Sequence, residues 1–285
     1  KSDKLAGLLT MAQVLNANIE PLVSYWNEEM KLHPNIEIKL NTKVDVDTLR
    51  ALNPDQVIVS PGGGIIPIDV PGIDGKNVVK SEDIKAMCNG IVPEGKGMIW
   101  KAAVAAIKAQ GGTVGFMRMG LNMKSGPTAI VGKRVVVVGG GNTAAADVIY
   151  LARICRKVYL VHRRDKLRAT AIYHERLREL GNVEFCWDSI AEEFIAGENG
   201  RVTGLKLRNV KTDDERVLAA SAVFIAIGMR PYTAFLEGDL ETDGGGYIVA
   251  DAMGRTTMPG VFAAGDVRTK ELRQVVTAVA DGANC

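Results

Sequence analysis

The chain has 285 residues, of which 47% are hydrophobic and 24% are charged, and its formal net charge at pH 7 is +2. This length allows two domains of ordinary size with adequate cores, and the composition is typical of a soluble globular protein. A net charge this close to zero does not indicate a general polyanion-binding surface, so we expect no nucleic-acid partner. The sequence shows no signal peptide and no long apolar run, so we expect a cytoplasmic protein without a membrane anchor.

Cysteine usage argues against one kind of redox site. The chain has Cys88, Cys155, Cys186 and Cys285, and no two of them have C-x-x-C spacing. A built-in dithiol relay is therefore not expected. Thiols this sparse fit a reducing compartment.

The first predicted element is a helix. Pro21 suits the first turn of a helix, and Leu22, Trp26 and Met30 recur at four-residue spacing on one face, so we expect Trp26 in the core. The run His33-Pro34-Asn35 ends this helix.

Shorter elements follow. Residues 36–40 predict a strand, and Asp47 is expected to cap a short helix that Asn53 ends. Residues 57–59 predict a buried strand that leads into a glycine-rich loop, where residues 62–64 permit close backbone approach.

The stretch before the central part of the chain is the least familiar. Residues 98–109 predict an alanine-rich helix, and residues 113–117 predict a strand. Residues 95–130 are expected to form either an extra βα element or a linker, and we assign them no function.

The segment Gly132–Arg168 predicts a complete mononucleotide-binding unit. Residues 134–138 are a short β-branched run, typical of a parallel strand buried on both faces. Gly139, Gly141 and Ala144 then follow with the spacing G-x-G-x-x-A. In this spacing the first glycine permits a tight turn, the second lets the backbone approach a pyrophosphate, and the third small residue lets the helix pack closely on the strand.

The rest of this unit supports the same interpretation. Asn142 and Thr143 are expected to cap the following helix, whose free amide groups and positive dipole end suit a phosphate. The helix ends near Cys155, and residues 158–161 predict the second strand. Because strand, glycine loop, helix and strand occur in this order, we favour dinucleotide binding over a plain glycine turn.

The end of the second strand indicates which dinucleotide is bound. An NAD site places an acidic residue about 20 residues after the glycines, whereas this chain has His162, Arg163 and Arg164, followed by Arg168. A guanidinium group can pair with a 2′-phosphate through two donors, so the cluster favours NADP(H). NAD stays open because Asp165 could reach the ribose. A solvated basic turn or a nucleic-acid patch is the alternative, and the position at a strand end argues against both.

Further strands complete the pattern. Residues 183–187, 222–227 and 261–264 each predict a short strand. Residues 190–196 and 201–207 predict a hairpin across the turn sequence GENG.

Five motifs now carry a family resemblance. From Gly132 to Cys285 the chain resembles the thioredoxin reductase group of pyridine-nucleotide flavoproteins, because GGGNTA, VHRRDKLRA, FIAIGMRP, PGVFAAGDV and RQVVTA occur in that family's order. The resemblance implies an α/β fold with two Rossmann-like three-layer domains, an NAD(P)-binding domain inserted into an FAD-binding domain. The predicted limits are residues 132–238 for the NAD(P)H-binding domain, and residues 1–131 and 239–285 for an FAD-type domain that lacks its first βα unit.

The same resemblance implies further cofactor-binding residues, most of them for FAD. It places one residue near the flavin pyrophosphate, one at the crossing back toward the flavin domain, two beside the ribityl chain and three at the start of a helix that faces the isoalloxazine. These residues are Gly7, Gly228, Gly265, Asp266, Arg273, Gln274 and Val275. Two positions depart from the family pattern: Ala6 replaces a usual glycine, and residues 60–62 replace an A-T-G turn.

The first residues, KSDKLAGLL onward, are similar to the C-terminal flavoprotein portion of 2,4-dienoyl-CoA reductase and 2-enoate reductase, the old-yellow-enzyme-linked NADH:flavin oxidoreductases. In those proteins a barrel precedes this portion. The FAD-binding glycine fingerprint and the ribose-binding acid of that family are absent here. We therefore expect a fragment that is impaired in FAD binding.

Together these resemblances imply an NADPH-dependent FAD oxidoreductase that passes hydride from NADPH to FAD and electrons onward to an acceptor. The expected acceptor is an FMN and 4Fe-4S barrel for enoate or enoyl-CoA substrates, with both of those cofactors only in a missing upstream domain. A cysteine-less ferredoxin-NADP reductase fits equally well, and reduction of a disulfide on another protein is less favoured. A catalytically silent nucleotide-binding fragment is the non-enzyme alternative, and homo-oligomerisation stays open.

No catalytic residue and no metal ligand are assigned from the sequence. The three histidines, His33, His162 and His174, do not occur in a triad-like setting. The chemistry is expected to come from the cofactors, with the protein supplying orientation and electrostatics.

Overall fold

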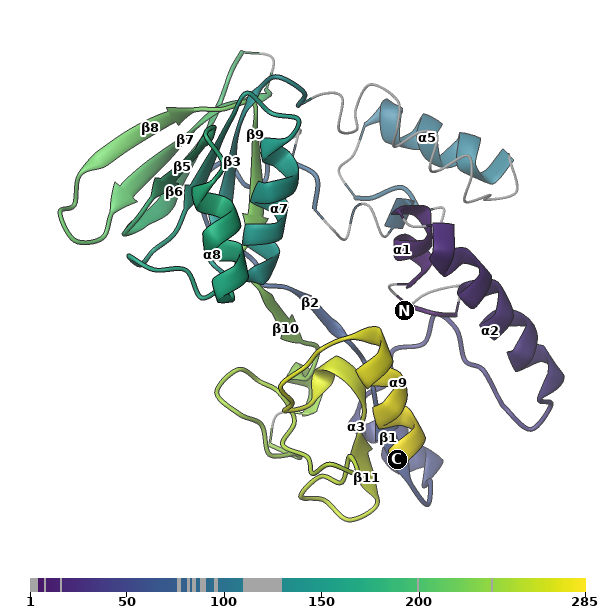
Figure 1. Ribbon diagram of the computed structural model, residues 1–285. Coiled ribbons are helices and arrows are strands. Elements are labelled where there is room, and N and C mark those ends of the chain that lie inside the picture. Colours follow the sequence, from purple (N-terminus) through teal and green to yellow (C-terminus); the bar gives the residue numbers. More distant parts are fainter. Residues whose placement is uncertain are drawn as a thin grey trace. The chain divides into compact units, whose positions relative to one another are not determined.

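The computed structural model describes residues 5–7, 9–15, 17–75, 78–80, 83, 86–87, 91–94, 97–109, 130–198, 200–236 and 238–285 (Figure 1). The chain divides into two compact units. The first comprises Lys1–Thr42 and Ile68–Ile227, and the second comprises Lys43–Pro67 and Gly228–Cys285. The predicted domain limits at residues 131 and 238 stay a prediction, and the strand predicted at 113–117 lies outside the described residues.

A parallel sheet forms the centre of the first unit. Its four strands run in the order β5-β4-β3-β9, and every neighbouring pair is parallel. The strands are β3 (Arg134–Gly139), β4 (Lys157–Val161), β5 (Val183–Cys186) and β9 (Ala222–Ala226). This sheet confirms the strands predicted near residues 134, 158, 183 and 222.

Layers on the two faces of this sheet complete a three-layer arrangement. Helices α7 (Asn142–Ala152) and α8 (Ala171–Arg178) cover one face, and an antiparallel sheet covers the other (Figure 1). That second sheet has the order β6-β7-β8 and consists of β6 (Ser189–Ala196), β7 (Val202–Asn209) and β8 (Glu215–Ala219). The hairpin predicted across GENG is therefore confirmed.

The four valines of β3 explain why this strand lies at the centre. Val135 and Val137 pack with α7 and α8, whereas Val136 and Val138 pack against the antiparallel sheet. Each is at most 8% exposed. A strand covered on both faces needs apolar residues at every position rather than at alternate ones, as the sequence predicted.

The described helices of the remaining first unit are α1 (Leu9–Leu15), α2 (Glu20–Leu32) and α5 (Met98–Ala109), with the 3-10 turn η1 (Ala17–Ile19). The bounds of α5 match the prediction. Two other predictions were wrong: Trp26 is 40% exposed, with Val23 as the buried residue of α2, and residues 36–40 form no strand. The Trp26 ring lies beside the neighbouring Tyr25 ring, with the ring centres 5.5 Å apart.

Parallel and antiparallel strand pairs organise the second unit. Strand β1 (Val57–Val59) pairs in parallel with β11 (Val261–Ala263), and β2 (Gly63–Ile65) pairs antiparallel with β10 (Met229–Pro231). Around them lie α3 (Val46–Leu52), α9 (Val275–Asn284) and the 3-10 turns η3 (Ala234–Leu236) and η4 (Gly265–Val267). The core contains Val59, Leu236, Ile248, Ala263 and Val267.

The cap of α3 differs from the prediction. The N-cap is Asp45, whose carboxylate accepts hydrogen bonds from the Thr48 backbone amide at 2.9 Å and the Thr48 hydroxyl at 2.6 Å. Asp47 lies inside the first turn instead. The end of the helix was predicted correctly, since Asn53 adopts the left-handed conformation at φ 44°.

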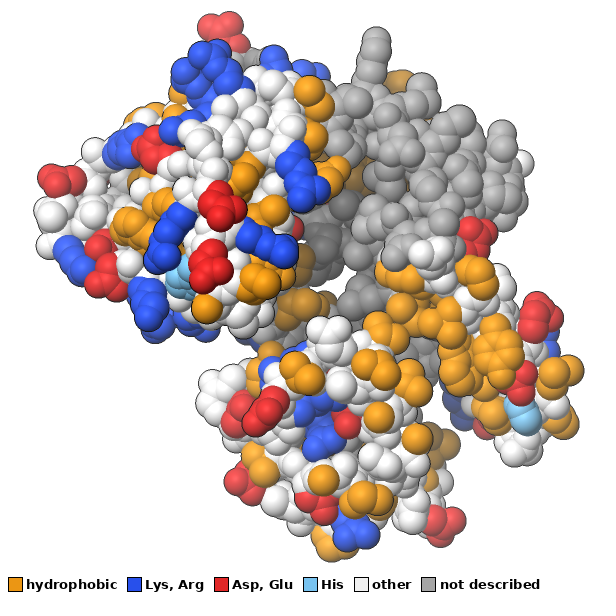
Figure 2. All heavy atoms as spheres, viewed as in Figure 1, with side chains coloured by type: hydrophobic (Ala, Val, Ile, Leu, Met, Phe, Trp, Pro, Cys, Tyr) orange, Lys and Arg blue, Asp and Glu red, His pale blue; other side chains and the backbone are white. Residues whose placement is uncertain are grey.

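Two surface properties bear on function. Acidic and basic side chains are interspersed over the first unit in the view of Figure 2, in keeping with the small net charge. Among the described residues, no helix combines the length and the apolarity needed to cross a bilayer.

Candidate functional site

The turn after β3 requires glycine at its first position. Gly139 has a φ of 156°, and a Cβ atom added there would collide with the Ala226 carbonyl oxygen of β9 and lie 3.0 Å from the Ala144 Cβ atom. Larger side chains at either position would push α7 away from the sheet. The glycine loop, defined here as residues 139–141, therefore holds the start of α7 directly against the strand end.

The start of α7 corrects one prediction. Its N-cap is Gly141, with extended backbone at φ −93° and ψ −177°, and no side chain caps it. Asn142 and Thr143 are the first two helical residues, so neither is the cap. The Asn142 side-chain oxygen instead accepts a hydrogen bond from the Thr170 backbone amide at 2.9 Å. The first-turn amides of α7 lack intrahelical partners and form a place where an anion can bind.

Hydrogen bonds join the glycine loop to the segment that follows β4. The Gly140 carbonyl oxygen accepts from the Arg168 backbone amide at 2.7 Å and from the Ala169 backbone amide at 3.1 Å. We call residues 162–170 the arginine loop. Arg163, Arg164 and Arg168 are all exposed, and the charges of all three act on His162, which lies under Gly140. The structure thus brings these predicted site residues together.

His162 lies beneath the glycine loop rather than on the surface. Its side chain is buried, and a Cβ atom added at Gly140 would overlap the imidazole ring. Burial lowers the pKa of His162, and the positive charges of Arg168, Arg164 and Arg163 lower it further, against the effect of a hydrogen bond with the Lys166 backbone. The ring is therefore neutral at pH 7, and its buried Nε2 atom has no hydrogen-bond partner among the described residues.

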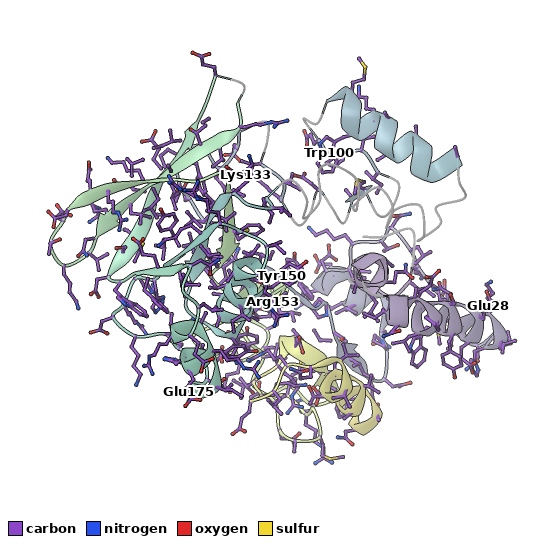
Figure 3. All side chains as sticks on the ribbon, turned by 45° about the horizontal axis from the view of Figure 1, so that its top comes forward. Glu28, Trp100, Lys133, Tyr150, Arg153 and Glu175 are labelled. Atoms are coloured by element: carbon purple, nitrogen blue, oxygen red, sulfur yellow. The ribbon has the colours of Figure 1, made fainter. Side chains whose placement is uncertain are left out.

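The opposite end of α7 has a different character. Tyr150 and Arg153, labelled in Figure 3, lie where α7 ends, and Tyr150 is exposed. This end carries helix carbonyl groups rather than amides, so it repels rather than attracts phosphate. It provides a place for control substitutions.

Several predicted flavin residues lie together in the second unit. Gly265 has a φ of 80°, and Asp266 is exposed directly after it. Gln274 is the N-cap of α9 and exchanges hydrogen bonds with Thr277 in a capping box. The Arg273 guanidinium lies 3.8 Å from the centre of the Tyr247 ring, a cation–π contact that holds the side chain in place. Val275, the first residue of α9, is exposed beside them.

Gly7 and Gly228 belong to different units. Gly7 belongs to the first unit, where its carbonyl oxygen accepts a 2.7 Å hydrogen bond from the Thr10 hydroxyl. The preceding Ala6 has a φ of 75°, a conformation that favours the glycine the family usually has there. Gly228 belongs to the second unit, and its carbonyl oxygen accepts from the Ile66 amide at 3.1 Å. Gly7 is therefore described with the first unit, and Gly228 with the second.

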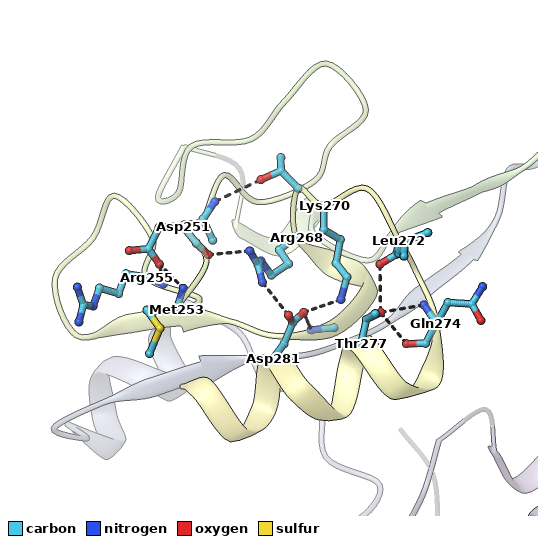
Figure 4. A network of polar contacts seen from close by, with 12 residues as sticks. Asp251, Met253, Arg255, Arg268, Lys270, Leu272, Gln274, Thr277 and Asp281 are labelled. Atoms are coloured by element: carbon cyan, nitrogen blue, oxygen red, sulfur yellow. Dashed lines mark hydrogen bonds and ion pairs between the residues drawn. The ribbon is translucent and has the colours of Figure 1, made fainter.

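A buried ion cluster beneath Gly265 was not predicted (Figure 4). The Asp281 carboxylate accepts from Arg268 at 2.8 Å, from Lys270 at 2.7 Å and from the Gly265 amide at 2.9 Å. Arg268 also donates to the Asp251 carbonyl oxygen at 2.6 Å. An acidic residue inside the apolar helix sequence VVTAVADGAN was the available signal that a buried partner exists.

The charges in this cluster stabilise one another. Burial alone would raise the pKa of Asp281, but hydrogen bonds from Lys270 and Gly265 and the charges of Arg268 and Lys270 hold that pKa below its usual range. Asp281 is therefore ionised at neutral pH. It fixes the Gly265 backbone, and with it the neighbouring Asp266, to α9.

The sequence matches a known protein family and several known proteins. The family model described as pyridine nucleotide-disulphide oxidoreductase matches residues 14–282. Thioredoxin reductase of Listeria monocytogenes is 48% identical over 151 residues, which are 53% of this chain and 47% of that protein. Thioredoxin reductase 2 of Arabidopsis thaliana is 39% identical over 191 residues, which are 66% of this chain and 46% of that protein.

Solved structures of thioredoxin reductases are similar to this chain in fold. Thioredoxin reductase of Lactococcus lactis in its FR conformation superposes with a TM-score of 0.56 at 29% identity, over 81% of this chain and 63% of that one. Thioredoxin reductase of T. acidophilum gives a TM-score of 0.50 at 32% identity, over 55% of this chain and 52% of that one. These structures confirm the predicted α/β class with Rossmann-like domains. The chain spans about half the length of the curated relatives it matches.

Proposed function

The chain belongs to the pyridine nucleotide-disulphide oxidoreductase family, and from this premise we propose that it is the NADPH- and FAD-binding part of an oxidoreductase. One observation carries the proposal. The Gly140 carbonyl oxygen accepts hydrogen bonds from the amides of Arg168 and Ala169, so the glycine loop and the arginine loop are joined directly. Together the two loops offer amide donors and guanidinium groups, which are the donors that a pyrophosphate and a 2′-phosphate require.

The residues present fit the nucleotide. The glycine loop and the first turn of α7 would hold the pyrophosphate, because no side chain caps the helix there. Arg163, Arg164 and Arg168 would hold the 2′-phosphate, because their exposed guanidinium groups can each present two donors. His162 would act from below, by filling the space beneath Gly140 with an uncharged ring.

The residues present fit the flavin in part. Gly265 and Asp266 would hold the ribityl chain, and Arg273, Gln274 and Val275 would face the ring system at the start of α9. For the ADP half of FAD the sequence holds no G-x-G-x-x-G. FAD, when bound, supplies the two-electron redox chemistry, and the protein orients it and sets the local charge.

As the electron acceptor, we propose a redox group that the cysteines of this chain do not supply. Burial raises the pKa of the Cys155 thiol and raises that of Cys186 to about 11, so both stay protonated and unreactive at neutral pH. An enoate- or enoyl-CoA-reducing barrel with FMN and a 4Fe-4S cluster is the first candidate, supported by the first residues of the chain. Ferredoxin is the second, supported by the absence of C-x-x-C spacing.

The test is an absorption spectrum of the purified chain with FAD, followed by anaerobic addition of NADPH or NADH. We expect the flavin bands to bleach faster with NADPH. Replacing Arg163 and Arg164 by alanine should slow bleaching by NADPH much more than by NADH, since only NADPH carries the 2′-phosphate. Replacing Arg153 and Arg156, which are exposed at the other end of α7, removes the same charge and should change neither rate.

Two results would contradict the proposal. Equal losses for both nucleotides in the Arg163 and Arg164 variant would exclude the assignment of the 2′-phosphate. A chain that binds NADPH but no FAD would support the catalytically silent nucleotide-binding alternative. Anaerobic reduction of ferredoxin or thioredoxin by NADPH, measured with the same protein, would separate the acceptor candidates.

A further inference from the structure

Asp165 is the one acidic residue inside the arginine loop, and its position raises a question about nucleotide preference. A free carboxylate there would repel a 2′-phosphate and could accept hydrogen bonds from the ribose hydroxyls of NADH. The structure pairs it with a base. Lys211, from the turn between β7 and β8, has its Nζ atom 3.6 Å from Asp165 and 3.0 Å from Asp188.

The position of Lys211 is set by its own turn. The Asn209 side-chain oxygen accepts hydrogen bonds from the Lys211 backbone amide at 2.9 Å and from the Thr212 amide at 3.1 Å. The Asn209 backbone amide in turn donates to the Asp214 carbonyl oxygen at 2.8 Å. The turn therefore presents the lysine side chain from an ordered backbone.

Asp188 connects this turn to the arginine loop. Its amide donates to the Arg164 carbonyl oxygen at 3.3 Å, and its own carbonyl oxygen accepts from the Val210 amide at 2.6 Å. The Asp188 side chain is only 16% exposed, whereas that of Asp165 is 76% exposed. Lys211 is thus anchored by a largely buried acid and directed toward an exposed one.

Resting on the proposed function, we propose that Lys211 is a specificity residue for NADPH over NADH. By pairing with Asp165, it neutralises the one negative charge in the arginine loop and keeps that carboxylate from the ribose. A hydrogen bond with Asp188, followed by the charges of both acids, raises the pKa of Lys211, so the lysine is charged at neutral pH. It acts on the nucleotide through Asp165, as a positioning residue.

The chain offers a matched control on the same strand pair. Lys206 in β7 also pairs with two acids, Glu192 at 3.2 Å and Glu215 at 2.8 Å. Neither acid belongs to the arginine loop. A change of Lys206 to methionine therefore removes a comparable ion pair whose acids lie outside the arginine loop.

The experiment is calorimetric titration at low ionic strength of NADPH and NADH into the wild type, K211M, K206M and the double variant D165N/K211M. A carboxylate released beside the 2′-phosphate should weaken NADPH binding about fivefold, because repulsion between close charges in water is on the order of 1 kcal/mol. We expect that loss for NADPH in K211M, unchanged or tighter NADH binding, recovery in D165N/K211M, and no change in K206M. The effect should shrink as salt is added.

The outcomes separate this inference from the proposed function. A wild type that prefers NADPH, with K211M binding like K206M, would overturn the role of Lys211 and leave the proposed function standing. Equal losses of both nucleotides in K211M would also overturn it, because a collapsed loop does not distinguish them. A wild type without any preference for NADPH would count against the proposed function itself.

Discussion

Replacing Asp281 by alanine should destabilise the second unit severely. The substitution removes the acceptor of Arg268, Lys270 and the Gly265 amide. Arg268 is 7% exposed and the Lys270 side chain is 10% exposed, so two cations would be left buried without a counterion. Removing one partner of a buried ion pair costs about 3–5 kcal/mol. That corresponds to more than a hundredfold in the unfolding equilibrium.

Hydrogen exchange measured by mass spectrometry can report this loss for each unit separately. Amides in residues 261–285 should exchange at least about a hundredfold faster in D281A. All three tryptophans, Trp26, Trp100 and Trp187, belong to the first unit, so tryptophan fluorescence should still report a folded first unit. This provides an internal control in the same sample.

Two variants calibrate the result. D266A removes an exposed carboxylate two residues before Arg268 and should cost no more than about 0.5 kcal/mol. D281N keeps the shape and an acceptor for Gly265 but loses the charge, so its exchange rates should lie between those of the wild type and D281A. Wild-type exchange rates in D281A, or equal losses in D266A, would refute the reasoning.

Three further predictions concern pH, the glycine loop and the thiols. The folded-state pKa of Asp281 is lowered. Its contribution to the free energy of unfolding is therefore present above the unfolded pKa of about 3.9 and is lost as pH falls through the folded pKa. Acid should destabilise the wild type more than D281N in denaturation titrations. G139A should lower the free energy of unfolding by at least about 2 kcal/mol in thermal unfolding, because its Cβ atom would meet the Ala226 carbonyl oxygen. G141A, with nothing within 4 Å of its Cβ atom, should fold normally and weaken NADPH binding. Cys186 should react with iodoacetamide far more slowly than a free thiol at pH 8, and equal rates would contradict its pKa of about 11.

The β3-α7-β4 unit could be predicted because its information is local. Four consecutive valines specify a strand buried on both faces. The small size of Gly139 and Ala144 is what lets α7 pack closely on that strand. The position of the arginine loop near the glycine loop could also be predicted, because neighbouring parallel strands end at the same edge of the sheet. Whether these residues bind NADPH stays a prediction.

Errors arose where backbone geometry or distant partners decide the outcome. An N-cap residue needs an extended backbone. In α7 the residue with that backbone is Gly141 rather than Asn142, and in α3 it is Asp45 rather than Asp47. Helical spacing showed that α2 has an apolar face but not that Val23, rather than Trp26, is its buried residue. The bonds between Asp281 and its partners span up to 16 residues, and no periodic pattern encodes them.

The most direct test of the central claim, that the glycine loop and the arginine loop form one NADPH site, is calorimetric titration of the purified chain with NADPH and with NADH. Charge-assisted hydrogen bonds from the arginines to the 2′-phosphate contribute about 1.5–3 kcal/mol, so NADPH should bind at least about tenfold more tightly. Equal affinities for the two nucleotides, or no binding of either, would contradict the account.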